Sequence, residues 1–107
     1  KLIGVCGLTY IDWKNKHAEI SCYLNSANWQ KTKEANDTIH TILKYGFEEL
    51  NLHRIWAEIF STAQENIALF NKIGFVREGI LRQKLWRDGK WWNSHIYSML
   101  SSEFNKK

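Results

Sequence analysis

The chain has 107 residues, of which 44% are apolar and 14% aromatic, so it is long enough to form one small domain with a hydrophobic core. This composition excludes a disordered tail. The net charge of +4 is compatible with an acidic partner, but a moderate excess of lysine also serves solubility, so charge alone indicates no function.

Targeting and metal-binding signals are lacking in the sequence. No apolar run approaches the roughly 20 residues that span a bilayer, and the N-terminus does not resemble a secretory signal. We therefore expect a soluble, cytoplasmic protein. Cys6 and Cys22 lie in strand-like segments without the spacing of a metal site, so we expect two buried free thiols and no metal.

The N-terminal segment predicts a β-hairpin. Residues 2–11 form an apolar, strand-like run, residues 12–17 supply a polar turn, and strict alternation resumes in "AEISCYL", residues 18–24. In this second strand the two faces differ: one carries Ala18, Ile20, Cys22 and Leu24, and the other carries Glu19, Ser21 and Tyr23.

Two helices and one strand are predicted next. Helical spacing of apolar residues predicts a helix from about Lys33 to Leu50, and "HRIWAEIF", residues 53–60, is typical of a strand. A short helix follows from about Gln64 to Ile73, with Gly74 as its stop. We expect the apolar stripe of this helix to be formed by Ile67, Phe70 and Ile73 more than by Leu69.

The C-terminal segment predicts a second hairpin, with strands over residues 75–86 and 91–100 joined at "RDGK". The order is therefore β-β-α-β-α-β-β in one domain over residues 1–107. A helix between the second and third strands implies a right-handed crossover and a parallel pair in an otherwise antiparallel sheet. The expected fold class is α/β with a mixed sheet, and ligands of such folds usually bind where strand ends meet a helix N-terminus.

Four stretches carry a resemblance to a known family: "IGVCGLTYIDWKNKHAEI", "YGFEELNLHRI", "LFNKIGFVREGILRQ" and "RDGKWWNSHIYSML". In order and spacing they resemble the GNAT N-acyltransferase superfamily, in particular its ribosomal-protein and spermidine acetyltransferases. That family normally begins with one more strand and one or two helices, which carry part of the acceptor site. We therefore expect this chain to be an N-terminally shortened, GNAT-like domain with its core one layer short, and to self-associate or to expose an apolar patch.

The resemblance implies transfer of an acetyl group from acetyl-coenzyme A to a primary amine, with acetyl-coenzyme A as co-substrate. The pantetheine arm would lie between the strands "AEISCYL" and "HRIWAEIF" and bond to the first of them, near Cys22 and Leu24. The pyrophosphate would sit on the loop before the first helix. Which amine accepts the acetyl group stays open among peptide N-termini, polyamines and amino sugars.

The expected phosphate loop departs from the family pattern of Arg or Gln, two residues, Gly, one residue, then Gly or Ala. In one register Thr32 and Glu34 stand where small residues belong. In the next register Gln30 and Ala35 match the pattern, but Lys33 stands where the glycine belongs. Lys31 and Lys33 favour binding of phosphate, although a solvated helix entry explains these lysines equally well.

The short helix departs from the family in two places. The family asparagine falls on Ala63 and the family tyrosine, which commonly protonates the leaving thiolate, falls on Phe70. Asn66 lies where the family has a small residue, and Lys72 opens the family ending "K-x-G-F". We keep all four as candidate coenzyme-binding positions, with a core aromatic as the alternative for Phe70.

Glu19 is our first candidate for the catalytic base because it resembles the glutamate of the family's "AEI" strand, and a half-exposed carboxylate paired with a lysine is the alternative. Tyr23, on the same face, is a candidate for orienting the amine or donating a proton. Glu58 is the second strand-borne carboxylate near the expected cleft, and His17 and His53 are imidazoles at strand starts.

Two other classes of function are weighed. The departures at the loop, Ala63 and Phe70 favour a non-catalytic coenzyme A-binding or assembly module. The basic, aromatic stretch "RQKLWRDGKWW" could bind single-stranded nucleic acid, but we expect its tryptophans to serve a core or a subunit interface. We therefore expect acetyl-coenzyme A and an amine as partners, a homo-oligomer, and neither membrane nor nucleic acid.

Overall fold

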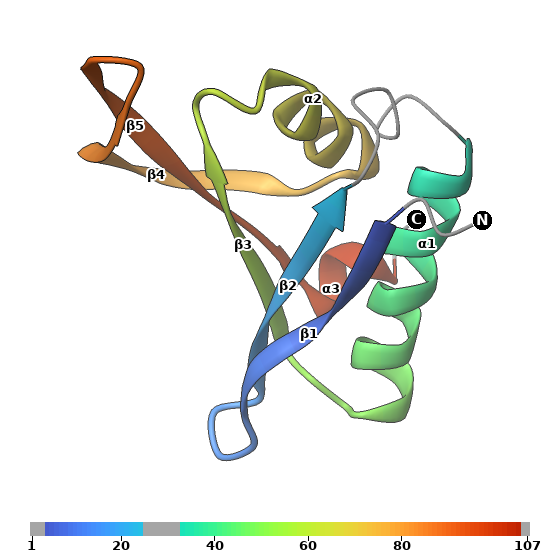
Figure 1. Cartoon of the computed structure of the whole chain (residues 1–107). Coiled ribbons are helices and arrows are strands. Elements are labelled where there is room, and N and C mark those ends of the chain that lie inside the picture. The colour runs from blue at the N-terminus through green and yellow to red at the C-terminus, as the bar shows by residue number, and fades with distance from the viewer. Residues whose placement is uncertain (1–3, 25–32, 106–107) are drawn as a thin grey trace.

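The computed structural model describes residues 4–24 and 33–105, which form one sheet with helices packed against it (Figure 1). The elements follow in the predicted order with one short helix added: β1 (Gly4–Asp12), β2 (His17–Leu24), α1 (Lys33–Lys44), β3 (Arg54–Phe60), α2 (Gln64–Ile73), β4 (Val76–Arg87), β5 (Lys90–Leu100) and α3 (Ser101–Phe104). The predicted β-β-α-β-α-β-β order is confirmed.

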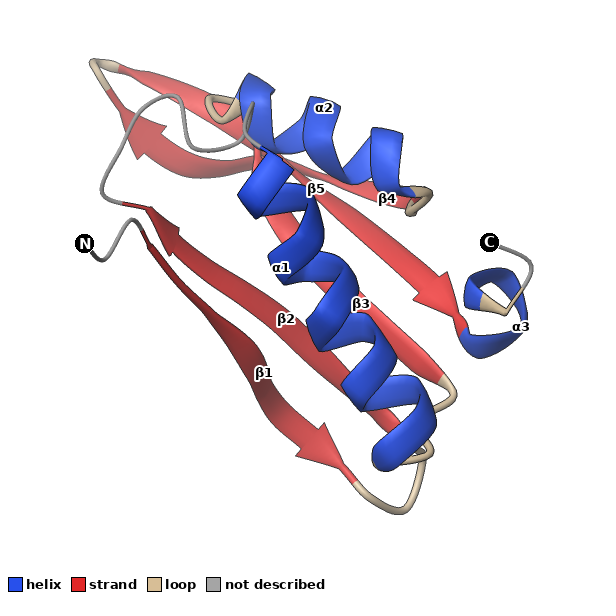
Figure 2. Ribbon diagram, turned by 90° about the vertical axis from the view of Figure 1, so that its right-hand side faces the viewer, coloured by secondary structure: helices blue, strands red, loops and turns tan. Residues whose placement is uncertain are grey.

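The five strands lie in the order β1-β2-β3-β5-β4. Only β2 and β3 are parallel, because α1 connects them, whereas the other three neighbouring pairs are antiparallel. Figure 2 shows α1 and α2 side by side on one face of this sheet. The predicted α/β fold with a mixed sheet is confirmed.

The core lies between the two long helices and the sheet. Ile39 and Leu43 of α1, Ile55 of β3 and Met99 of β5 are all fully buried. On α2 the prediction was wrong in one respect, because Leu69 is 5% exposed and belongs to the core, while Ile67 and Ile73 are only partly buried.

The helix end and the tight turn that glycines predicted are both confirmed. Helix α2 has the predicted bounds and ends at Gly74, whose φ of 118° allows the amides of Gly74 and Phe75 to donate to the carbonyl of Phe70. Asp88 and Gly89 both adopt positive φ, 55° and 77°, as the tight turn between β4 and β5 requires. Sequence-local turn chemistry thus positions both the short helix and the last hairpin.

The first helix is shorter than predicted. Helix α1 ends at Lys44, and the chain continues to Glu49 as a π-helical turn in which the amide of Leu50 donates to the carbonyl of Tyr45 over 3.1 Å. Gly46, in this turn, lies directly against β3: a Cβ there would come within 2.8 Å of Ile55 Cδ1. The absence of a side chain therefore lets the turn approach the sheet.

The short helix α3 was not predicted. Its Phe104 is 7% exposed and stacks on His40 of α1 and on Phe47, with ring centroids 5.2 and 5.3 Å apart. The carboxylate of Glu103 accepts a hydrogen bond of 2.9 Å from the amide of Leu100, which fixes the first turn.

The tryptophans of the last hairpin are more exposed than expected of a core. Trp86 and Trp91 are 58% and 54% exposed and contact each other edge to face, with ring centroids 5.1 Å apart. Trp92 points to the other face, as predicted, is partly buried and donates from Nε1 to the carbonyl of Arg87 over 2.9 Å.

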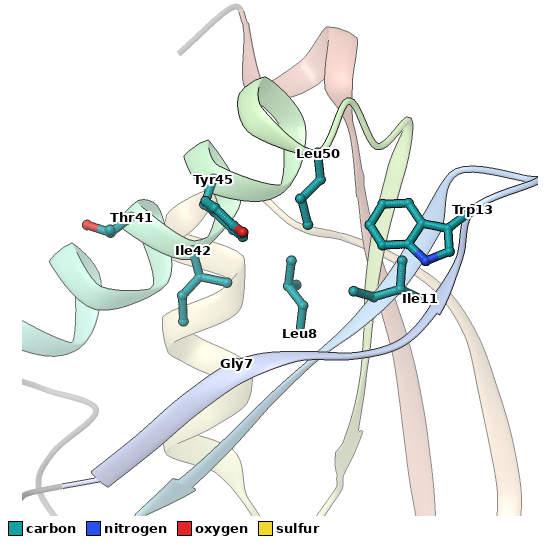
Figure 3. Close-up of a pocket in the computed structure, with 8 residues that line it drawn as sticks. All are labelled: Gly7, Leu8, Ile11, Trp13, Thr41, Ile42, Tyr45 and Leu50. Atoms are coloured by element: carbon teal, nitrogen blue, oxygen red, sulfur yellow. The ribbon is translucent and has the colours of Figure 1, made fainter.

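An apolar groove of about 510 Å³ lies between β1 and α1 (Figure 3). Leu8 and Ile11 of β1 form one wall, and Ile42 and Leu50 face them from the helix side. Trp13, which is 61% exposed, lies at one end. The groove is the exposed apolar patch that we expected, whereas self-association stays a prediction.

None of the helices described here is long and apolar enough to span a membrane. Within residues 4–24 and 33–105, no group of three or more His, Cys, Asp or Glu side chains is placed to hold a metal ion. The side chains of Cys6 and Cys22 lie outside the described part of the structure, although their Cα atoms are opposite each other in the β1/β2 pair.

Substitution of Gly46 by alanine is expected to destabilise the protein by about 1 kcal/mol, because the added methyl group overpacks fully buried Ile55 and this outweighs the gain in helix propensity. The free energy of unfolding in urea measures this change. Gly79→Ala is the matched control, because a Cβ there meets nothing within 4 Å. Equal stability of both variants would contradict the close approach.

Candidate active site

The candidate site is the gap where β2 and β3 separate. The two strands pair only from His17↔Arg54 to Glu19↔Trp56, although β2 continues to Leu24 and β3 to Phe60. Beyond Glu19, β2 remains paired with β1 as far as Gly4↔Leu24, and β3 remains paired with β5 as far as Phe60↔Ser94. Each strand thus follows its outer partner, and Figure 1 shows the resulting divergence.

A cavity of about 250 Å³ occupies this gap and is lined from both faces of the sheet. Glu19 and Glu58 come from the face opposite the helices, because they alternate with the buried Ile20 and Ala57. Helix α2 covers the other face. The lining residues are Glu19, Ile20, Ser21, Ala57, Glu58, Ile59, Phe60, Asn66 and Phe70.

The diverging part of β2 has a free edge toward the gap. Beyond Glu19↔Trp56, β2 and β3 no longer pair with each other, and no other described strand pairs with the side of β2 that faces the gap between Ile20 and Leu24. Backbone N–H and C=O groups at such an edge can pair with an extended ligand that carries amide groups. This edge is therefore available to an extended ligand that carries amide groups.

Glu58 is held by two donors from the neighbouring strands. Its Oε2 atom accepts hydrogen bonds from Lys84 Nζ, 2.6 Å away, and from Ser94 Oγ, 2.7 Å away, and the side chain is 18% exposed. Burial raises the pKa of Glu58, but the hydrogen bonds and charge of Lys84 and the bond from Ser94 together lower this pKa below its ordinary value. Glu58 is consequently ionised.

The pKa of Glu19 is shifted in the opposite direction. Burial raises the pKa of Glu19 and the negative charge of Glu58 raises it further, while Lys84 lowers it by a smaller amount. Two carboxyl groups that line one cavity are thus shifted in opposite directions, which is a common feature of acid-base sites. The group with the raised pKa is the better proton acceptor.

The remaining predicted residues are placed as follows. Asn66 and Phe70 both line the gap. The ring of Phe70 is buried and packs against Phe75, with ring centroids 4.8 Å apart. Ala63 is the N-cap of α2 and provides no side-chain hydrogen bond there. Lys72 is exposed on the same helix.

The start of α1 is only partly described. Glu34 is exposed and Ala35 is fully buried in the core. Of Cys22, Tyr23, Leu24 and Lys33 the structure describes the backbone alone, and Gln30, Lys31 and Thr32 lie outside the described residues. Their roles therefore stay predictions.

His17 lies at the paired end of β2 and His53 directly precedes β3, and neither of them lines the gap. Lys84 and Ser94, in contrast, were missed. Lys84 was predicted only as part of a basic hairpin. The alternation of side chains along a strand does not reveal that Lys84 extends across β5 to Glu58 of β3. Ser94 is one of several polar residues of β5, and only its complete burial in the structure shows that it needs a hydrogen-bond partner.

The known proteins that this chain resembles are N-acetyltransferases. A family profile described as an acetyltransferase (GNAT) domain matches residues 1–96. An uncharacterized N-acetyltransferase, p20 from Bacillus licheniformis, is 34% identical over 104 residues, which are 97% of this chain and 58% of that relative. A spermidine N(1)-acetyltransferase from Vibrio cholerae is 27% identical over 103 residues, 96% of this chain and 59% of that protein.

Solved structures agree with these relatives. The spermidine/spermine N-acetyltransferase SpeG from Vibrio cholerae superposes with a TM-score of 0.86 at 26% identity, over 99% of this chain and 62% of that chain. The present chain thus spans 58% and 59% of the two curated relatives described above.

Replacement of Ala63 by serine is expected to stabilise the protein by about 0.5–1 kcal/mol, because a hydroxyl at the N-cap can accept a hydrogen bond from a backbone amide of the first turn of α2, which the alanine side chain cannot do. Thermal or urea unfolding measures the gain. Ala68→Ser, at an exposed position inside the same helix, is the control and should be neutral or slightly destabilising. A gain at both positions would argue against capping.

Glu19→Gln is expected to stabilise the protein at pH 7 by less than about 1 kcal/mol. The folded state raises the pKa of Glu19 above the ordinary 4.5, so folding binds protons and stability falls as pH rises through this range. The gain should shrink below pH 4.5, where the carboxyl is neutral in both states.

Urea unfolding at pH 7 and at about pH 4 measures this difference, with exposed Glu49→Gln as the control. A gain of equal size at both pH values would show that packing, not ionisation, is responsible.

Proposed function

Because the chain belongs to the GNAT acetyltransferase family, we propose that it transfers an acetyl group from acetyl-coenzyme A to a primary amine. The observation that supports this most directly is the separation of β2 from β3 after Glu19↔Trp56. It leaves an edge of β2 that no described strand pairs with, and a cavity lined by side chains from both faces of the sheet. An extended thiol carrier can enter along the edge while an amine approaches the carboxylates.

Glu19 is the proposed base. A protonated amine must lose a proton before its nitrogen can attack the thioester carbonyl, and a carboxylate with a raised pKa is suited to accept this proton through water. The C–N bond forms as the C–S bond breaks, and coenzyme A leaves as a thiolate. Tyr23, on the same face of β2, is a second candidate for orienting the amine.

The leaving group does not depend on Phe70. Its buried ring carries no proton to donate, so the thiolate takes its proton from solvent or from the attacking nitrogen, which must lose its excess proton as the amide forms. Thiol pKa values lie only slightly above neutrality, and a thiolate is therefore an adequate leaving group. Alignment of the amine and the thioester supplies the remaining acceleration.

The acceptor is proposed to be a cationic amine, because both ionisable groups that line the gap are carboxylates. Two relatives are named as spermidine acetyltransferases, which act on such an amine. Peptide N-termini and amino sugars carry an ammonium group as well. Cytoplasmic location and homo-oligomerisation belong to the same proposal.

The alternative is a non-catalytic module that binds coenzyme A or supports assembly. It is favoured by Ala63 and Phe70, which stand where the resemblance implies an asparagine and a proton-donating tyrosine. Phe70 is also packed against Phe75 in the manner of a core residue.

Calorimetric titration with coenzyme A and acetyl-coenzyme A, followed by an assay of thiol release with a panel of amines, distinguishes the two. We expect binding and amine-dependent thiol release. Glu19→Gln should lower the rate by about 10²–10⁴-fold without loss of coenzyme A binding, whereas Glu49→Gln should change neither.

Binding without thiol release would support the module instead. Absence of both heat and turnover at millimolar ligand would refute the acetyltransferase proposal and the module together as coenzyme A-binding functions. Phe70→Tyr tests the missing acid separately: a higher rate would show that the hydroxyl acts in the gap.

A further inference from the structure

Lys84 reaches the candidate site because of an irregularity in β4. Leu81 pairs with Ser94 and Leu85 pairs with Trp92, so residues 82–84 of β4 lie opposite Asn93 alone. Gln83 adopts a φ of 50° and its amide donates to Asn93 Oδ1 over 3.0 Å. Such a bulge changes the direction of the following side chain.

The redirected side chain extends across a neighbouring strand. In the order β3-β5-β4, strand β5 lies between Lys84 and Glu58. Lys84 Nζ nevertheless comes within 2.6 Å of Glu58 Oε2, the same atom that Ser94 Oγ of β5 contacts at 2.7 Å. The small serine at this crossing leaves room for the lysine.

This contact changes the charge that an incoming amine meets. Glu19 and Glu58 alone would present two negative charges to the gap. Lys84 neutralises one of them and occupies one oxygen of Glu58, as an ammonium group of an acceptor would. No lysine or arginine of the described residues forms an ion pair with Glu19. One ammonium group of an acceptor can therefore pair with Glu19, whereas a second one would meet Glu58 already paired with Lys84.

We propose that Lys84 determines acceptor specificity: its ammonium group takes the place of a second positive charge of the substrate, so the site favours amines with one positive charge over diamines. Only the identification of the bound amine as the acetyl acceptor rests on the proposed function; the effect of Lys84 on amine binding does not. Because Lys84 is 49% exposed, its effect is screened and is expected to be moderate.

The test compares n-butylamine with 1,4-diaminobutane, which differ by one ammonium group at equal chain length. Lys84→Met should increase the preference for the diamine over the monoamine roughly two- to fivefold, and Lys84→Arg should keep the original preference. The preference is measured as the ratio of Kd values in NMR titrations without acetyl-coenzyme A, and as the ratio of kcat/KM values with it.

Lys90→Met is the matched control, because Lys90 lies on the same hairpin but contacts Trp92 and not Glu58. An unchanged ratio in Lys84→Met, an equal change in Lys90→Met, or no amine binding to any variant would overturn the proposal. If amines bind with the expected ratios but no acetylated product forms, the role of Lys84 stands and the acetyltransferase function fails.

Discussion

The separation of two parallel strands is the constraint on which the candidate site depends. β2 and β3 share three pairs and then part, because the hairpin with β1 and the long pairing with β5 hold them on different courses. Among the described residues, the divergence leaves the side of β2 that faces β3 without a strand partner from Ile20 to Leu24. A backbone that is incomplete in this way is suited to bind a ligand that resembles a strand.

The same divergence explains why two glutamates differ in ionisation. Glu58 lies where β3 is still paired with β5, so Ser94 and Lys84 can reach it from the paired side. Glu19 lies at the last residue pair before the gap, where burial and the charge of Glu58 act on it. The pKa of Glu58 is therefore lowered by donors from the paired strands, whereas the pKa of Glu19, at the edge of the gap, is raised.

Local patterns in the sequence predicted most of the fold. Alternation in "AEISCYL" and "HRIWAEIF", the turn at Asp88 and Gly89, and the stop at Gly74 each depend on neighbouring residues, and the structure agrees with them. The change from α1 to a π-helical turn at Tyr45 was not predicted, because the apolar spacing continues through it, and the close approach of Gly46 to Ile55 involves a later strand. Burial of Leu69 similarly reflects tertiary packing rather than helical spacing.

The candidate site was predicted less completely, because its charges come from strands far apart in the chain. Glu19 and Asn66 were identified, but the bulge that directs Lys84 depends on registry between β4 and β5. Since β4 is an edge strand, insertions or replacements in the bulge alter few hydrogen bonds of the central strands. The acceptor preference proposed for Lys84 thus depends on one peripheral strand, whose bulge can change without disturbing the pairing of β2, β3 and β5.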